Sequence, residues 1–163
     1  MHTPHAASHD ETRNHETVDD DIWLVSLHAL RELCGDTVFD YNPWGCQPPI
    51  TAQEVHCALQ RNILEPTPFS TENSPQFWNR DQHIARIAYL VANQDPHPID
   101  IDVGVPELGC HVSWPVQDGN HRGAAAILRQ DSHITCTLAG STAVLANLHP
   151  ICATDPSIAF ETP

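Results

Sequence analysis

Lysine is absent from this 163-residue sequence, and its seven permanently charged basic residues are all arginine. P-loop proteins, Schiff-base enzymes and protein kinases each need a lysine ammonium group at the reacting centre. The absence of lysine therefore excludes all three kinds of site. Any phosphate group must be held instead by arginine, histidine, backbone amides or a metal ion.

The sequence also has no apolar run of the roughly 18 to 20 residues needed to cross a bilayer. Its polar start, Met1 to His5, lacks the charged-then-apolar order of a secretory signal. We therefore expect a cytoplasmic protein that makes no membrane contact. The chain length and a hydrophobic content of 40% predict one globular domain with flexible ends.

Positive charge is scarce, because 21 acidic residues against seven arginines give a formal net charge of -14. Indiscriminate nucleic-acid binding depends on Lys and Arg side chains that replace condensed counterions. Non-specific nucleic-acid binding is therefore not expected. An acidic surface suits a small-molecule substrate or a protein partner better than a polyanion.

Cysteine pairs of the CxxC kind are missing, although the chain has six cysteines and 12 histidines. Without a secretory signal, the cysteines are expected to be reduced and mostly buried. Two neighbouring sets, Cys110-His111 and His133 with Cys136, have no second half at zinc-finger spacing. A structural zinc site is therefore not expected.

Composition divides the chain into four segments. A His-rich tail over residues 1–18 has almost no large apolar residue and is expected to be disordered. A helical N-terminal region is expected over 19–77, a core over 78–150 and a loose C-terminal tail over 151–163.

Apolar spacing within these segments predicts an α+β fold, a small mixed sheet with flanking helices. Thr51 is expected to cap the second helix, and Cys34-Gly35 to end the first. The expected helices lie over 22–33, 51–63 and 79–91, and the expected strands over 99–103, 111–116 and 134–138.

The segment that carries chemistry is 116–128, which predicts a strand, a tight turn and a helix. Gly119 permits a backbone conformation closed to other residues, and the next helix turn directs its amides and positive dipole end outward. Such helix ends bind anions, and His121 and Arg122 add two side-chain donors. The alternative is a plain Asp-Gly turn in which Asp118 caps the helix and both donors are solvated.

The sequence Val116-Gln117-Asp118-Gly119-Asn120-His121-Arg122-Gly123-Ala124-Ala125-Ala126 resembles the signature of the ParB/sulfiredoxin-like superfamily. In that superfamily a strand is followed by an Asp-Gly-x-His-Arg turn and then by a helix of small residues. The upstream order of a helix, Pro98-Ile99, a strand and a return strand agrees with the signature. The resemblance covers about residues 78–140 and implies the small mixed sheet of that superfamily.

Members of the superfamily bind nucleotide phosphates at this turn: ATP in sulfiredoxin, a nucleotide in the free-serine kinases and CTP in the partition proteins. The resemblance implies that Gly119 and the Asn120 amide cradle a phosphate, that His121 and Arg122 contact it, and that Asp118 orients the turn or places Mg²⁺. It makes Asp118 and His121 the expected catalytic residues. The expected cofactors are a nucleoside triphosphate or diphosphate, foremost ATP, and Mg²⁺.

Two departures from the superfamily narrow this expectation. Sulfiredoxin has a cysteine between the glycine and the histidine, and Asn120 stands at that position here. Reduction of sulfinic acid is therefore excluded. The arginine-rich turn of the partition proteins and a basic helix-turn-helix are also absent, so clamp loading on DNA is not expected of this chain.

The leading functional hypothesis is a phosphotransferase or NTP hydrolase that acts on a small molecule. Phosphoryl transfer depends on positioning and charge neutralisation, which arginine, histidine, helix amides and Mg²⁺ supply without lysine. A second hypothesis is a non-enzymatic module of plasmid or phage origin that a nucleotide switches. A ParB-like nuclease ranks third, because the charge balance opposes it.

Several other side chains near the motif are weaker candidates. His83 is expected to pack beside an apolar stripe or to cap, with a role in the site as the alternative. Arg80 and Arg86 are either solvated or reach toward a phosphate, and Asp100 and Asp102 either form a solvated acidic strand face or ligate Mg²⁺. Three tryptophans are expected to be packing residues, with stacking on an adenine as the alternative: Trp44, Trp78 and Trp114.

Overall fold

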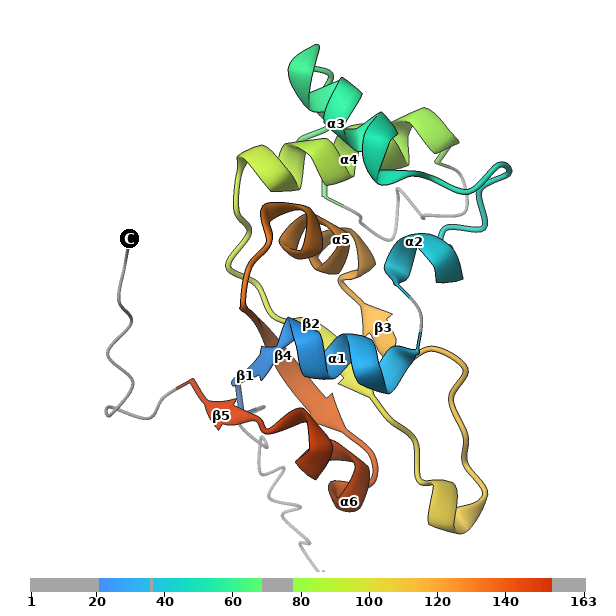
Figure 1. The fold of residues 1–163 in the computed structure, drawn as a ribbon, viewed down its shortest axis with the longest axis vertical. Coiled ribbons are helices and arrows are strands. Elements are labelled where there is room, and N and C mark those ends of the chain that lie inside the picture. The colour runs from blue at the N-terminus through green and yellow to red at the C-terminus, as the bar shows by residue number, and fades with distance from the viewer. Residues whose placement is uncertain (1–20, 36, 69–77, 154–163) are drawn as a thin grey trace, which may run out of the picture.

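The computed structural model describes residues 21–35, 37–68 and 78–153. The expected tail over 1–18 and the chain end from 154 lie outside these residues. The fold is α+β, as the sequence predicts: helices pack around a five-stranded mixed sheet of order β3-β2-β4-β1-β5 (Figure 1). The strands are β1 (Trp23–Ser26), β2 (Ile99–Asp102), β3 (Val116–Asp118), β4 (His133–Ala139) and β5 (Ile151–Cys152).

The first strand corrects the expectation of a helix over 22–33. Residues Trp23–Ser26 form β1, which pairs antiparallel with both β4 and β5. Only after Ser26, whose Oγ accepts from the Ala29 amide, does helix α1 (Leu27–Cys34) begin. The region over 19–77 therefore contains a strand as well as helices. The expected segment boundary at 77/78 would divide β1 from β4 and β5, the strands with which it pairs.

The last strand gives a second correction. Ile151 and Cys152 form β5, which pairs with β1 in the register Trp23↔Cys152. The expected loose tail therefore begins with a strand. The expected return strand over 111–116 is also shifted, because β3 begins at Val116.

The remaining helices follow the capping signals in the sequence. Thr51 and Asn79 each form a capping box with the residue three positions later, and these boxes begin α3 and α4. Gly35, at φ 74°, ends α1 as predicted. The helices beyond α1 are α2 (Val38–Tyr41), α3 (Ala52–Gln60), α4 (Arg80–Ala92), α5 (Asn120–Arg129) and α6 (Thr142–Leu145).

The helices form layers beside the sheet (Figure 1). Helix α5 packs between α4 and the sheet, and α3 covers α4 on its outer side. Strand β2 has the predicted alternation, since Ile99 and Ile101 are buried and Asp100 is exposed. These isoleucines share one apolar core with Ile87 of α4 and Val25 of β1.

The structure bears on two further expectations, the absence of a membrane-spanning segment and the burial of reduced cysteines. In the described part of the chain, no helix combines the length and the apolar character needed to span a bilayer. The six cysteines form no disulfide, but only Cys46 and Cys136 are buried, and Cys110 is exposed. The expectation of mostly buried cysteines therefore holds for two of the six, since Cys34, Cys57 and Cys152 are half-buried.

Candidate functional site

The turn between β3 and α5 has the conformation that the motif predicts. Gly119 has a φ of 83° and serves as the N-cap of α5. A Cβ atom at this position would lie 2.5 Å from Cγ2 of Ile99. Two constraints therefore require glycine at position 119: its left-handed backbone conformation and the close packing of the turn on β2. It lies against the sheet and does not border an open phosphate cradle.

Arg122 is engaged by its own chain. Its Nη2 atom donates to the carbonyl oxygen of Pro98 at 2.9 Å and to Oδ2 of Asp118 at 3.2 Å. The Arg122 side chain is 22% exposed, whereas that of Asp118 is 70% exposed. The guanidinium therefore ties the first turn of α5 to the start of β2. These bonds occupy Nη2, whereas Nε is buried without a hydrogen-bond partner among the described residues, and the expected phosphate contact at Arg122 stays a prediction.

His121 is buried, which corrects the expectation that it faces an open anion site. Its Nε2 atom lies 2.9 Å from Nδ1 of His83 on α4, and the two rings stack with an interplanar angle of 7°. Burial, followed by the charges of His83, Arg86 and Arg122, holds the pKa of His121 well below its usual value. Burial also lowers the pKa of His83. The neutral pair joins α4 to α5, so His83 packs as predicted.

Tryptophan rings surround this histidine pair. The Trp44 ring lies 5.2 Å from the His121 ring, and the Trp78 ring lies 5.8 Å from the His83 ring. Trp114 stacks on Tyr41 at 4.5 Å. The three tryptophans pack against other rings, as the sequence predicts.

The two arginines of α4 hold loops instead of reaching toward the motif. Arg80 donates to the carbonyl oxygens of Pro48 and Pro49 and forms an ion pair of 2.6 Å with Glu54. Buried Arg86 donates to the carbonyl oxygen of Pro66 at 2.9 Å. Both side chains therefore have structural partners, and neither is simply solvated.

The carboxylates expected to place Mg²⁺ are not gathered into a metal site. Asp100 and Asp118 are cross-strand partners, but Asp100 accepts a hydrogen bond from Thr137 and Asp118 pairs with Arg122. Asp102 accepts from the Gly104 amide. Among the described residues, no group of three or more His, Cys, Asp or Glu side chains could hold a metal ion. Mg²⁺ held by one or two carboxylates together with a nucleotide's phosphates stays a prediction.

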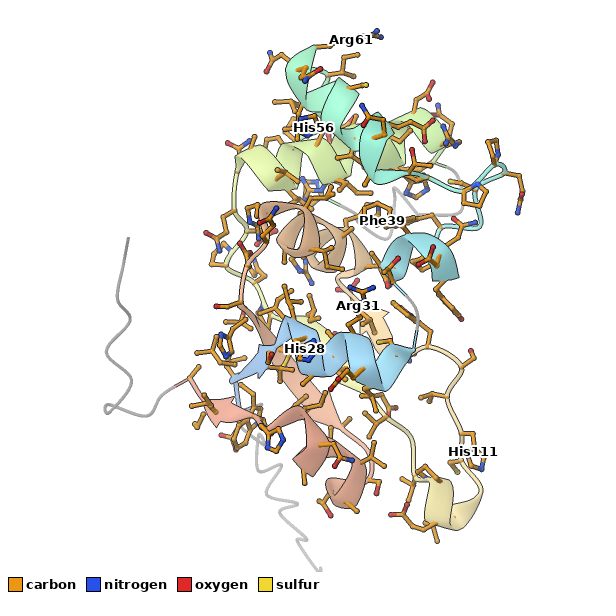
Figure 2. All side chains as sticks on the ribbon, in the orientation of Figure 1. His28, Arg31, Phe39, His56, Arg61 and His111 are labelled. Carbon is orange, nitrogen blue, oxygen red and sulfur yellow. The ribbon has the colours of Figure 1, made fainter. Side chains whose placement is uncertain are left out.

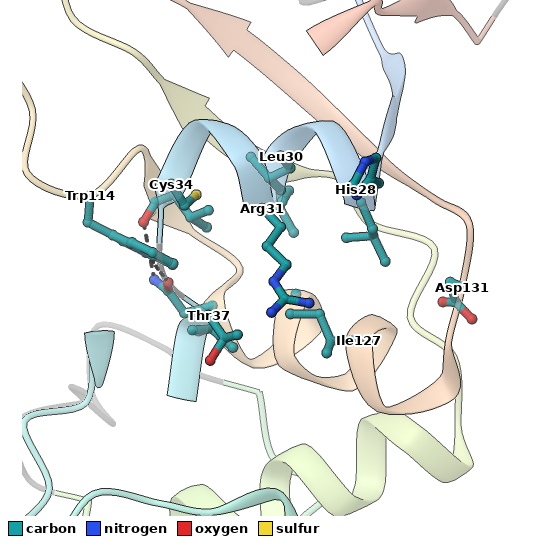
Figure 3. A pocket seen from close by; sticks show the side chains of 14 residues that line it. His28, Leu30, Arg31, Cys34, Thr37, Trp114, Ile127 and Asp131 are labelled. Carbon is teal, nitrogen blue, oxygen red and sulfur yellow. Dashed lines mark hydrogen bonds between the residues drawn. The ribbon is translucent and has the colours of Figure 1, made fainter. Parts of the chain in front are cut away.

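A cavity of about 270 Å³ lies between α1 and α5. We call this cavity the α1–α5 pocket. Residue Asn120 and the helical positions one and two turns later, Gly123 and Ile127, form one wall. The opposite wall is α1, from which the Arg31 side chain extends toward α5 (Figure 3). Of the five motif residues 118–122, only Asn120 lines this pocket.

Arg31 is the functional candidate that sequence reasoning missed. Its guanidinium makes no ion pair or side-chain hydrogen bond with any residue that the structure describes. By contrast, the arginines of α4 and α5 are all paired with carboxylates. One signal was available, since Arg31 is the sole arginine between positions 14 and 60.

Asn120 and Trp114 separate this pocket from a shallower groove. Trp114 Nε1 donates to Asn120 Oδ1 at 2.8 Å, and Asn120 Nδ2 donates to the carbonyl oxygen of Val116. The groove is lined by Tyr41, His111 and Gln117 on the other side of this wall. These two hydrogen bonds fix the Asn120 side chain. The bond to Trp114 also holds the indole ring in position in the wall of the α1–α5 pocket.

The site can thus be described as a mostly apolar pocket lined by the unpaired Arg31 and by Asp131, which is paired with Arg129, beside the positive end of α5. No side chain of Gly119 caps the first amides of this helix. Comparison of the chain with protein-family models, curated proteins and solved structures gave no match. The assignment of the site therefore rests on its own residues and geometry.

Proposed function

We propose that this chain is a binding module for a nucleotide or a closely similar small organic anion, held in the α1–α5 pocket. The observation that carries the proposal is the unpaired Arg31 guanidinium, which extends toward α5 at a mostly apolar pocket (Figure 3). Asp131 also lines this pocket, and its carboxylate is paired with Arg129. Four of the six described arginines have an acidic partner, and Arg31 and Arg61 do not. The planar guanidinium of Arg31 is suited to bind a phosphate or carboxylate through two parallel hydrogen bonds.

Two further features support an anion at this place. Helix α5 begins at Asn120 in the pocket wall, so the positive end of its dipole borders the pocket that Arg31 also lines. The resemblance of residues 116–126 to the ParB/sulfiredoxin-like signature also favours a nucleotide among small anions. The observed strand, turn and helix over 116–129 are compatible with that resemblance.

The geometry favours binding over phosphoryl chemistry. His121 is a buried, neutral partner of His83, and Asp118 is paired with Arg122. Neither residue lines the α1–α5 pocket. The two side chains expected to carry catalysis are therefore not placed beside the proposed ligand, and the hypothesis of a phosphotransferase or hydrolase loses its support from these residues.

Calorimetric titration with ATP, ADP, CTP and GTP, with and without Mg²⁺, tests the proposal. We expect at least one nucleotide to bind the wild-type chain, and Arg31→Gln to weaken its affinity by about ten- to a hundredfold, because a hydrogen bond to a charged group is lost. The matched control is Arg61→Gln. Arg61 also lacks an acidic partner within the described residues but lies at the end of α3, away from Arg31 (Figure 2).

Equal losses in the two variants, or no binding of any nucleotide by the wild type, would overturn the proposal. Release of phosphate or of a nucleoside diphosphate is measured in the same samples. Turnover by the wild type that Arg31→Gln abolishes would restore the phosphotransferase or hydrolase hypothesis.

A further inference from the structure

The size of the α1–α5 pocket limits how much of a ligand it can enclose. Its volume is about 270 Å³, just below the range of about 300 to 1,000 Å³ that buries most of a drug-sized molecule. A whole nucleotide would therefore not fit inside. One ring system would fit, with the rest of the ligand extending past the mouth.

The walls of the pocket have the chemistry that suits a ring. Leu27 and Leu30 come from α1, and Ile99, Trp114 and Ile127 come from the sheet, the loop before β3 and α5. Transfer of a flat apolar surface from water to these walls is favourable. An anionic group, by contrast, has one cationic partner here, the Arg31 guanidinium.

Gly123 is the most informative residue of the pocket. It lies inside α5, where glycine is less favourable than alanine. Its backbone is helical, and a Cβ atom added here would meet no other atom within 4 Å. Neither φ nor packing against the described residues therefore requires glycine at this position. What glycine does provide is a bare stretch of helix backbone facing the pocket.

We infer that Gly123 is a specificity residue, against whose bare backbone a planar aromatic ring of the ligand lies, while the ligand's anionic group binds Arg31. This inference rests on the proposed function and deepens it, since it assigns the ring to the pocket and the charge to its mouth. The ligand class is an aromatic ring with an anionic arm. Two sources share that chemistry, a nucleotide and an aromatic carboxylate.

The first test compares CTP and ATP with tripolyphosphate, which has the charge but no ring. We expect a nucleotide to bind the wild type at least about tenfold more tightly than tripolyphosphate, and Gly123→Val to remove that advantage because its side chain occupies the place of the ring. The control Ala92→Val adds the same branched side chain at an exposed position of α4. It should leave both affinities unchanged.

A second variant separates ligand binding from folding. Gly123→Ala should raise the melting temperature by about 2 to 4 °C, because alanine is the better helix former, and should still weaken nucleotide binding. In amide NMR spectra, the Gly123 signal should shift on addition of a nucleotide but not of tripolyphosphate. The signal of Gly109, in the projecting hairpin, should not move.

The outcomes distinguish this inference from the proposed function. If nucleotide and tripolyphosphate bind equally, and Gly123→Val changes neither affinity, the anion site stands and the ring assignment is wrong. If no nucleotide binds, the proposed function fails. In that case indole-3-acetate tests the ring assignment. The assignment stands if indole-3-acetate binds the wild type but neither Gly123→Val nor Arg31→Gln. It is wrong if indole-3-acetate does not bind the wild type.

Discussion

Nδ1 of His83 and Nε2 of His121 lie 2.9 Å apart, so two imidazoles from different helices share one hydrogen bond in the interior. One nitrogen must donate its proton and the other must accept it, which requires at least one ring to be neutral. A neutral ring and a protonated ring can still share this bond, but protonation of both rings would leave two donors facing each other and two positive charges side by side. The contact between α4 and α5 therefore depends on pH.

We expect the free energy of unfolding to fall as the pH is lowered from about 7 to 5. Burial depresses the pKa of both histidines in the folded chain, so below about pH 6.5 the unfolded chain binds more protons. Each histidine contributes a slope of at most about 1.4 kcal/mol per pH unit. Urea unfolding at several pH values measures this slope.

The variant His121→Gln should flatten this pH dependence, and His56→Gln, on the exposed face of α3, should not. An unchanged slope in His121→Gln would show that the pair does not control acid sensitivity in this range.

Gly119→Ala should destabilise the protein more than Gly109→Ala does. Both glycines have φ near 80°, which costs an alanine about 1 to 2 kcal/mol. At Gly109 the added Cβ meets nothing within 4 Å, whereas at Gly119 it would overlap Ile99 and add about 1 to 3 kcal/mol. Equal changes in the urea midpoint of unfolding would contradict the close packing of the turn on β2.

Arg122→Ala should cost more stability than Asp118→Ala. Loss of the Arg122 bond to the carbonyl oxygen of Pro98 is expected to cost about 1.5 to 3 kcal/mol. The exposed ion pair with Asp118 is worth at most about 1 kcal/mol. Thermal unfolding of both variants at the same pH measures the difference. A larger loss in Asp118→Ala would instead assign the main role of Arg122 to the ion pair.

Glu54 should contribute to stability at neutral pH and lose that contribution in acid. Its bonds to Arg80 and Thr51 lower its pKa to about 2. The contribution is present above about pH 4.5 and declines as the pH falls toward 2. Glu54→Gln should therefore narrow the stability difference between pH 7 and pH 3, measured by urea unfolding. Glu107→Gln, at an exposed position, is the control and should leave that difference as it is in the wild type.

The sequence was sufficient where the signals were local. The alternation of Ile99 and Ile101 with Asp100 predicted β2, the cap Thr51 predicted where α3 begins, and apolar spacing predicted α4. The Asp-Gly turn and the helix after it were also predicted. Each of these features depends on residues within a few positions of one another, which propensity and periodicity describe well.

The errors came from contacts between distant segments. Trp23 and Val25 lie in a strand because β4, more than a hundred positions later, pairs with them. His121 is buried because His83 faces it from α4. Arg31 looked like an ordinary surface residue of a helix, and only the packing of α1 beside α5 directs it into a pocket. No local pattern contains this information.

Strand β1 also constrains when the protein can fold. Its partners are residues 133–136 and 151–152, so its hydrogen bonds cannot form on the ribosome until nearly the whole described chain has emerged. Until then the nascent chain carries an unpaired Trp23–Ser26 segment. Closing so long a loop is entropically costly and slows folding. Strand β1, which lies between β4 and β5, is therefore made before the other described strands and is among the last to be paired.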